Sequence, residues 1–174
     1  MVGGDRTGSL EGCYTLGDYR GPLKKALLQL KFSGRPSRGG AFVFLLSHFP
    51  WWQELERADL CVPVPLSRKR KRQRGSNQTD LIFQKYMEDR GKSYAEALIR
   101  IRDTRPQHFL GRQERKKNLR MAFWVPCGEQ VRNRNILLLD DIYTTGSTMK
   151  AAAEELKRAG ALTVTGMTAA SGAD

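Results

Sequence analysis

The segment that indicates the fold is ILLLDDIYTTGST, residues 136–148. Its four leading apolar residues are typical of a buried central strand. Two acidic residues, Asp140 and Asp141, follow at the expected carboxyl end of that strand, and small and hydroxyl-bearing residues then lead into a helix. In open α/β sheets, ligands bind in the crevice beyond the carboxyl ends of the strands. The segment therefore predicts a binding site as well as a strand.

The residue types of this segment suit a sugar phosphate. Main-chain N–H groups near a helix N-terminus form an anion cradle, and Gly146 lets a ligand approach the backbone closely. Hydroxyl groups for the same ligand come from Thr144, Thr145, Ser147 and Thr148. Asp140 and Asp141 would repel a phosphate, so they are better suited to ribose hydroxyls or to the outer coordination of a phosphate-bound Mg²⁺. A ribose 5-phosphate therefore fits the segment.

On both sides of this segment, strand-like and helix-like patterns alternate along the chain. Strands are expected at 13–19, 59–65, 97–102, 121–125, 135–141 and 162–171. Helices are expected at 22–32, 41–55, 77–90 and 147–159, and Gly160 is a C-cap for the last of them. The alternation predicts an α/β fold around a largely parallel sheet. We expect residues 1–12 to form a flexible N-terminus and residues 13–174 a single domain.

Composition limits the class of protein. The 174 residues carry a net charge of +12, which favours a polyanionic partner such as nucleic acid, a phosphorylated metabolite or an anionic surface. Three widely spaced cysteines give neither a zinc site nor a disulfide framework and indicate reduced thiols in the cytoplasm. The apolar run 41–49 is too short to span a bilayer, so no membrane insertion is expected. Trp51 and Trp52 are expected in the core.

A second distinctive stretch is the basic run within PLSRKRKRQRGSNQ, residues 65–78. It holds six cationic residues between an apolar strand and a glycine, and we expect it to be a loop. By itself it is open to three interpretations: a nuclear address, a DNA-binding arm, or a loop that holds a phosphorylated ligand. Its position between a strand and a helix makes the nuclear address the weakest of these.

The segment 136–148 lacks the P-loop pattern but resembles the thirteen-residue signature of type I phosphoribosyltransferases throughout. Together with LKFSGR (30–35), the basic run and the polar stretch 104–118, the chain resembles the ComF family of competence-related phosphoribosyltransferase-like proteins. The resemblance implies the type I phosphoribosyltransferase fold, with a largely parallel central sheet flanked by helices. Two departures are the missing Cys-rich zinc ribbon and Ser76, which stands where the family usually has an aromatic residue.

The resemblance also implies a donor, 5-phosphoribosyl 1-pyrophosphate with Mg²⁺, bound at Asp140, Asp141 and the loop 144–148. It assigns the segment 66–78 to the pyrophosphate, with Arg68, Arg74, Gly75 and Asn77 as the contacts. It identifies 104–118 as a catalytic loop that closes over the donor. The candidate residues in that loop are Arg105, Gln107, Arg112 and Arg115, whereas His108 is expected to be merely exposed.

The acceptor of the phosphoribosyl group stays open. Hypoxanthine–guanine enzymes resemble the signature but have Asp at the position of Thr144, and Thr cannot act as a base near neutral pH. The first hypothesis is therefore Mg²⁺-dependent transfer to an unidentified, nitrogenous acceptor. The alternative is a non-catalytic sensor of phosphoribosyl ligands or a single-stranded DNA-binding module, since the family is associated with DNA uptake. The oligomeric state is not indicated by the sequence.

Overall fold

The computed structural model describes residues 8–33, 40–101 and 122–172. The predicted catalytic loop, with Arg105, Gln107, His108, Arg112 and Arg115, lies outside the described residues. The strands are β1 (Cys13–Thr15), β2 (Leu60–Pro63), β3 (Ile99–Arg100), β4 (Phe123–Trp124), β5 (Asn135–Tyr143) and β6 (Thr163–Ser171). The helices are α1 (Gly21–Ser33), α2 (Gly40–Ser47), α3 (Trp52–Leu55), α4 (Arg68–Arg74), α5 (Gln78–Asp89), the 3₁₀ helix η3 (Gly128–Gln130) and α7 (Ser147–Arg158).

The main sheet has the strand order β1-β6-β5-β2, and every pair in it is parallel. Leu60 pairs with Ile136 and Pro63 with Leu139, so β2 and β5 run in register to the same edge. The small pair β3–β4 is antiparallel and forms a separate ribbon. The predicted α/β fold with a largely parallel sheet is therefore confirmed.

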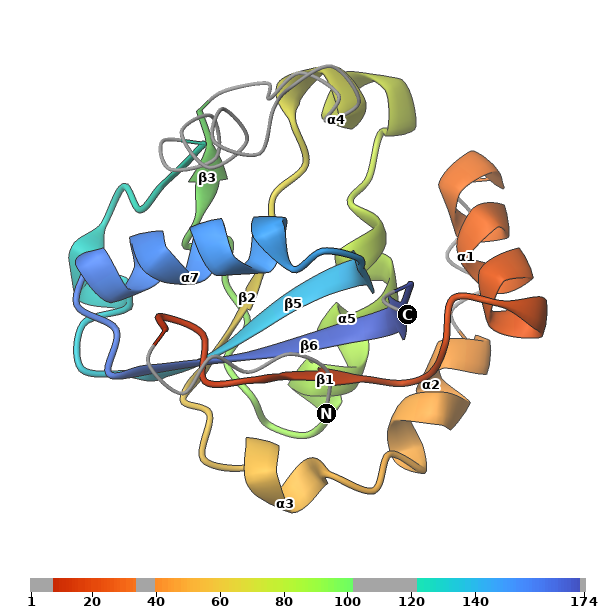
Figure 1. Ribbon diagram of the computed structural model, residues 1–174, viewed down its shortest axis with the longest axis horizontal. Helices are drawn as coiled ribbons and strands as arrows, with labels where there is room; N and C mark the ends of the chain where they lie inside the picture. Colours follow the sequence, from red (N-terminus) through yellow and green to blue (C-terminus); the bar gives the residue numbers. More distant parts are fainter. Residues whose placement is uncertain (1–7, 34–39, 102–121, 173–174) are drawn as a thin grey trace.

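The sheet is covered on both faces because its central strand is apolar on both sides. Ile136 and Leu138 of β5 face the core that α7 completes, whereas Leu137 and Leu139 face the core formed with α1, α2 and α5. All four side chains are almost fully buried. Figure 1 shows α7 crossing in front of the sheet and α5 behind it. Burial of a Leu or Ile side chain contributes roughly 1.5–3 kcal/mol, so β5 is the main hydrophobic anchor of the fold.

One expected helix and one expected core residue are wrong. The single helix predicted at 41–55 is two helices, α2 and α3, because Pro50 disfavours helical backbone at Phe49 and interrupts the hydrogen-bond ladder. Trp52 does pack in the core, where its Nε1–H donates to the carbonyl oxygen of Leu46 at 2.6 Å. Trp51 is 47% exposed, so the expectation that it is buried is also wrong.

The expected loop over the basic run is a helix as well. Arg, Lys and Gln are good helix formers, and the run lies between two capping residues. The hydroxyl of Ser67 accepts a hydrogen bond from the N–H of Arg70 at 3.3 Å. Gly75 ends α4 with φ +74°, and its N–H donates to the carbonyl oxygen of Lys71. The caps therefore convert a polar segment into a short helix, α4.

The packed part of the chain begins before β1. Within the predicted N-terminal segment 1–12, Leu10 belongs to the core on the α7 side. The N–H of Glu11 donates to the carbonyl oxygen of Val164 at 3.0 Å, next to the pairing of β1 with β6. The division into a flexible segment 1–12 and a single domain 13–174 stays a prediction.

Candidate functional site

The candidate site lies at the carboxyl-terminal ends of the parallel strands. The segment after β5 leads through Thr144 and Thr145 into α7, and the segment after β2 leads into α4. Both leave the same edge, because the N–H of Val64 still pairs with the carbonyl oxygen of Leu139 at 2.7 Å. Figure 1 shows this edge at the arrowheads of β5 and β6. The structure thus brings the two predicted ligand segments to one edge of the sheet.

The turn from β5 into α7 is shaped by Gly146. Its φ of +69° lies in the left-handed region, which glycine adopts without steric cost. A Cβ at this position would lie 2.3 Å from the hydroxyl oxygen of Tyr143. Thr145 and Ser147 exchange a hydrogen bond between their hydroxyl groups at 2.8 Å, and the side chain of Thr145 is exposed. Glycine is therefore needed here for both backbone conformation and space.

The beginning of α7 has the features of an anion site. The first N–H groups of an α-helix have no partner within the helix, and the helix dipole adds partial positive charge at the same end. Ser147 and Thr148, the first two residues of α7, keep part of their surface in solvent. The N–H of Ser147 donates to Oγ1 of Thr145 at 3.5 Å, and the two hydroxyl groups share a hydrogen bond. A phosphate oxygen bound at this end of α7 would take the place of Thr145 as the acceptor.

Asp140 and Asp141 lie within β5, not after it, because the strand extends to Tyr143. Each carboxylate accepts the N–H of the following residue through Oδ1 at 2.8 Å. Burial raises the pKa of the Asp140 carboxyl well above its usual range, and the neighbouring Asp141 charge raises it further. The N–H of Asp141 and the positive charge of Arg100 act in the opposite direction. The pair is thus electrostatically strained without a bound cation.

The carboxylate oxygens of this pair suit Mg²⁺, which prefers oxygen ligands and keeps several of its waters. Adjacent carboxylates at a strand end, one of them buried, can accept hydrogen bonds from those waters or from sugar hydroxyls. Among the described residues, no group of three or more His, Cys, Asp or Glu side chains could hold a metal ion alone.

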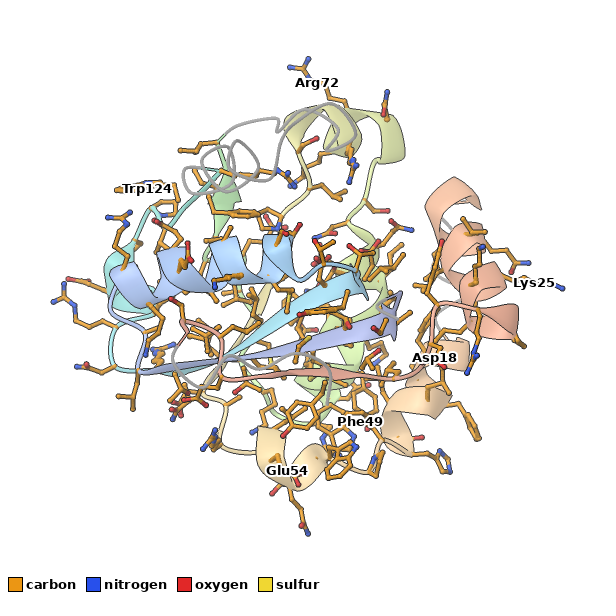
Figure 2. The ribbon with its side chains drawn as sticks, in the orientation of Figure 1. Asp18, Lys25, Phe49, Glu54, Arg72 and Trp124 are labelled. Carbon is orange, nitrogen blue, oxygen red and sulfur yellow. The ribbon has the colours of Figure 1, made fainter. Side chains whose placement is uncertain are left out.

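The predicted pyrophosphate residues have different places. Arg68 and Arg74 are the first and last residues of α4, and their side chains lie outside the described part of the structure. Gly75 is exposed and caps α4. Arg70, Lys71 and Arg72 are exposed, and Figure 2 shows Arg72 projecting away from the sheet. Asn77 was predicted to contact ligand, yet both ends of its amide group make intramolecular bonds.

Asn77 connects β2 to α5. Its Nδ2–H donates to the carbonyl oxygen of Val64 at 3.2 Å, and its Oδ1 accepts the N–H of Thr79 at 3.3 Å as the N-cap of α5. These bonds hold the start of α5 beside the end of β2. The observed role of Asn77 is therefore to shape the segment between α4 and α5.

Sequence reasoning missed three residues of the site: Ser67, Arg100 and Tyr143. Ser67 had a usable signal, because a serine directly before a run of good helix formers is a common N-cap. Arg100 acts on Asp140 from β3, at a distance in sequence that no local pattern spans. Tyr143 contacts Gly146 across a turn whose shape is not encoded in the residue types alone.

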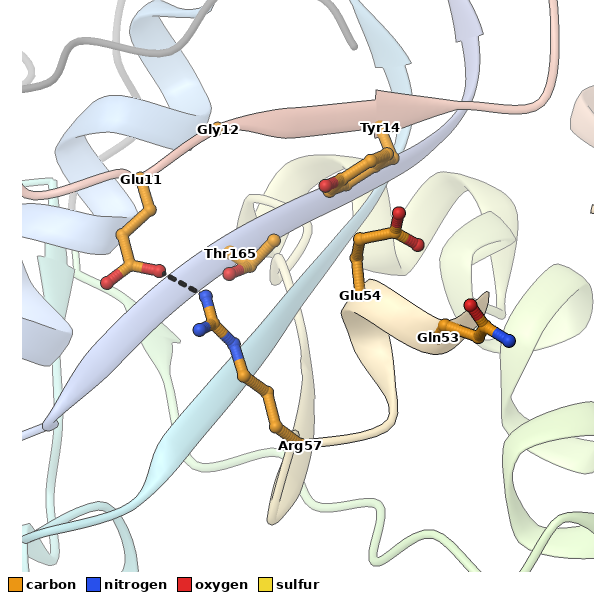
Figure 3. Close-up of a pocket in the computed structure, with 7 residues that line it drawn as sticks. All are labelled: Glu11, Gly12, Tyr14, Gln53, Glu54, Arg57 and Thr165. Atoms are coloured by element: carbon orange, nitrogen blue, oxygen red, sulfur yellow. Dashed lines mark hydrogen bonds and ion pairs between the residues drawn. The ribbon is translucent and has the colours of Figure 1, made fainter. Parts of the chain in front are cut away.

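A separate pocket of about 340 Å³ lies between β1, the start of β6 and α3. Figure 3 shows Glu11 and Arg57 joined by an ion pair, 2.8 Å between nitrogen and oxygen, with Tyr14, Glu54 and Thr165 around the hollow. The pocket lies toward the amino ends of the strands, so it is distinct from the turn 144–146.

In the described ranges, no helix has the length and apolar character to cross a membrane.

Comparisons with known proteins agree with this geometry. The family model for the phosphoribosyl transferase domain matches residues 58–173. The "DNA utilization protein YhgH" of Escherichia coli O6:H1 is 39% identical over 157 residues, which cover 86% of this chain and 67% of that protein. "Competence protein F" of Haemophilus influenzae is 30% identical over 109 residues, 62% of this chain and 48% of that protein.

Solved structures support the fold. The glutamine phosphoribosylpyrophosphate amidotransferase of B. subtilis, complexed with ADP and GMP, superposes with a TM-score of 0.54 at 20% sequence identity. The match covers 82% of this chain but 30% of the enzyme, so it shows a shared fold only. The matched domain and the relatives named for DNA utilization and competence show that the chain belongs to the ComF family of proteins with a type I phosphoribosyltransferase domain.

Proposed function

We propose that this protein binds 5-phosphoribosyl 1-pyrophosphate with Mg²⁺ and transfers its phosphoribosyl group to a nitrogenous acceptor in the cytoplasm. The observation that carries the proposal is the left-handed turn at Gly146, which opens the N-terminus of α7 directly after the Asp140–Asp141 pair. A phosphate site and a sugar-hydroxyl or cation site are thereby adjacent, as a ribose 5-phosphate requires.

The 5-phosphate is assigned to the turn and the first residues of α7. Backbone N–H groups and the hydroxyls of Thr144, Thr145, Ser147 and Thr148 donate to its oxygens, and Gly146 permits close approach. The ribose hydroxyls lie at Asp140 and Asp141. Asp140 and Asp141 would hold Mg²⁺ as outer partners, and the ion would supply positive charge that neutralises part of the pyrophosphate.

The pyrophosphate is assigned to α4 and the segment that joins it to the carboxyl-terminal end of β2. Cleavage of the bond at C1 leaves positive charge on the sugar and negative charge on the departing pyrophosphate. Cations there stabilise the leaving group. The predicted contacts are Arg68, Arg74, Gly75 and Asn77. Arg105, Arg112 and Arg115 remain the predicted catalytic residues, and they lie outside the described residues.

The test of donor binding is titration calorimetry with 5-phosphoribosyl 1-pyrophosphate in the presence and absence of Mg²⁺. Binding should require Mg²⁺ and be lost in the double variant Asp140→Asn, Asp141→Asn. The matched control is Glu88→Gln, Asp89→Asn, which removes the same charge from the exposed end of α5. It should bind as the parent does. No Mg²⁺-dependent binding by the parent protein would rule out the proposal.

Catalysis needs a separate assay. Release of pyrophosphate is measured across a panel of nucleobases and amines, with donor alone as the blank. Acceptor-dependent release identifies the acceptor class and supports transfer. Donor binding with no release for any acceptor favours the alternative, a sensor that uses the same pocket.

A second candidate function, binding of single-stranded DNA, is favoured by α4. Its exposed face carries Arg70, Lys71 and Arg72, and Lys71 makes only a loose ion pair with Glu96, 3.7 Å between nitrogen and oxygen. Several relatives are named for DNA utilization or competence. A surface ion pair of this kind contributes little, so Lys71 can exchange it for a phosphate.

The DNA test measures affinity for an oligonucleotide across a range of salt concentrations. Affinity should fall steeply with salt, and Arg70→Gln with Lys71→Gln should reduce the slope by about two counterions. The control is Lys24→Gln with Lys25→Gln on α1, also exposed. Equal slopes for both variants would exclude α4 as the DNA site. Competition between donor and DNA would show that both use one edge of the sheet.

A further inference from the structure

The ring of Tyr143 folds back over the turn that precedes α7. A Cβ placed on Gly146 would lie 2.3 Å from the Tyr143 hydroxyl oxygen, 2.7 Å from Cζ and 3.0 Å from Cε2. These distances put one edge of the ring in contact with the backbone of Gly146. Because only two residues, Thr144 and Thr145, lie between Tyr143 and Gly146, the contact encloses them in a compact loop.

The ring itself is anchored. Tyr143 packs against the core on the α7 side, which includes Cys13, Leu138 and Met149. Burial raises the pKa of its hydroxyl, with the nearby Cys13 as a smaller cause. Because the core fixes the position of the ring, the ring can restrict the conformation of the backbone that it touches.

Gly146 is the residue whose position matters for ligand binding. It is the N-cap of α7, with φ +69°, and its carbonyl oxygen accepts the N–H of Lys150 at 2.8 Å. Its conformation therefore sets the direction of the N–H groups of Ser147 and Thr148. A glycine without a contact on this side would sample several conformations, since it has no side chain to restrict it.

We propose that Tyr143 is a positioning residue that holds Gly146 in its left-handed conformation and so preorganises the phosphate-binding turn. The inference rests on the proposed function and deepens it: the phosphate affinity of the turn depends on a side chain that does not touch the phosphate. The hydroxyl oxygen makes the nearest approach to the Cβ position of Gly146, and the ring atoms Cζ and Cε2 lie directly behind it. Phe therefore keeps the ring part of the contact, whereas an aliphatic side chain keeps neither part.

The test compares Tyr143→Leu with Tyr143→Phe. Leu keeps apolar packing but removes the ring edge from Gly146, whereas Phe keeps it. Tyr143→Leu should weaken binding of the Mg²⁺-loaded donor and of ribose 5-phosphate by roughly 10-fold, the size of effect seen when a residue that orients a contacting group is removed. Tyr143→Phe should stay within about 2-fold of the parent, since the ring is retained.

The matched control is Gly160→Ala at the other end of α7. Gly160 has φ +104°, and a Cβ there would lie 3.3 Å from Cγ of Arg132, so the variant destabilises α7 without changing its N-terminus. It should lower the melting temperature and leave ligand affinity unchanged. A loss of affinity in Gly160→Ala equal to that in Tyr143→Leu would mean that stability alone explains the effect, and would overturn the inference.

A second readout needs no ligand. Hydrogen exchange of the Lys150 N–H reports the first bond of α7, and that of Ala159, which donates to Glu155 at 3.0 Å, reports the opposite end. Tyr143→Leu should accelerate exchange at Lys150 and not at Ala159. Unchanged exchange at Lys150 would overturn the inference. Failure of the parent protein to bind donor is a separate result, which counts against the proposed function and not against the contact of Tyr143 with Gly146.

Discussion

The backbone N–H of Asp141 donates to Oδ1 of Asp140 at 2.8 Å, which ties two neighbouring carboxylates to one strand end. The bond compensates only part of the cost of placing two negative charges side by side. Asp140 is the member whose pKa is raised, first by burial and then by the charge of Asp141. Ionisation of Asp140 in the folded protein is therefore unfavourable.

Asp140→Asn should stabilise the ligand-free protein at neutral pH. A raised pKa in the folded state means that the folded protein binds the proton more tightly than the unfolded chain, so ionisation of Asp140 destabilises the fold as pH rises. Asn cannot ionise, and the gain in free energy of unfolding should grow from about pH 4 to pH 7. Urea denaturation across this range measures it, and a gain that is independent of pH would contradict the assignment.

Ser67→Ala should weaken α4 by removing its N-cap. The hydroxyl accepts the N–H of Arg70 at 3.3 Å and Ser67 is buried, so the expected loss in free energy of unfolding is about 1 kcal/mol. Ser47→Ala is the matched control, because the Ser47 hydroxyl donates to a carbonyl oxygen on an exposed helix end. Equal losses in urea denaturation for the two variants would show that the cap contributes nothing specific.

Gly166→Ala should destabilise the protein because α7 approaches the sheet closely at this point. A Cβ on Gly166 would lie 2.7 Å from Cε of Met149 and 3.0 Å from Sγ of Cys13. Overpacking of this kind costs about 1–3 kcal/mol. Gly128→Ala is the control, since its Cβ would meet its nearest neighbour at an ordinary 3.5 Å. Thermal unfolding compares them, and a Gly166→Ala variant as stable as Gly128→Ala would show that Met149 and Cys13 move aside freely.

Glu155→Ala should be much more costly than Glu154→Ala on the same helix. Glu155 is 8% exposed, accepts the N–H of Val125 at 3.2 Å and pairs with Arg158. Its loss leaves a buried N–H without an acceptor, a penalty of about 1–3 kcal/mol. Glu154 is half-buried and makes no such bond to β4 and its flanks. A similar melting temperature for both variants would mean that water takes over the Val125 N–H.

The local pattern of the chain was sufficient for the sheet and for α7. Four apolar residues before Asp140 predicted a buried strand, and Gly160 predicted the end of α7, which the structure confirms with φ +104°. Such features depend on neighbours within a few residues, so a single sequence records them. The prediction of a loop at 68–74 was wrong, although the signal for a helix is also local. Ser67 and Gly75 cap the segment at its two ends, and these caps indicate a helix despite its high charge.

The phosphate site at the turn 144–148 stays a prediction, which rests on main-chain groups and hydroxyls in their local order. Contacts between distant segments were not accessible. The burial of Asp140, the charge that Arg100 adds from β3, and the use of the Asn77 amide between β2 and α5 all depend on which segments meet after folding. The sequence by itself determined a parallel α/β sheet with a glycine-containing turn into α7 after its central strand. Only the tertiary structure decided which carboxylate is buried, that the basic run is a helix, and that the ring of Tyr143 lies on Gly146, because these depend on packing across the molecule.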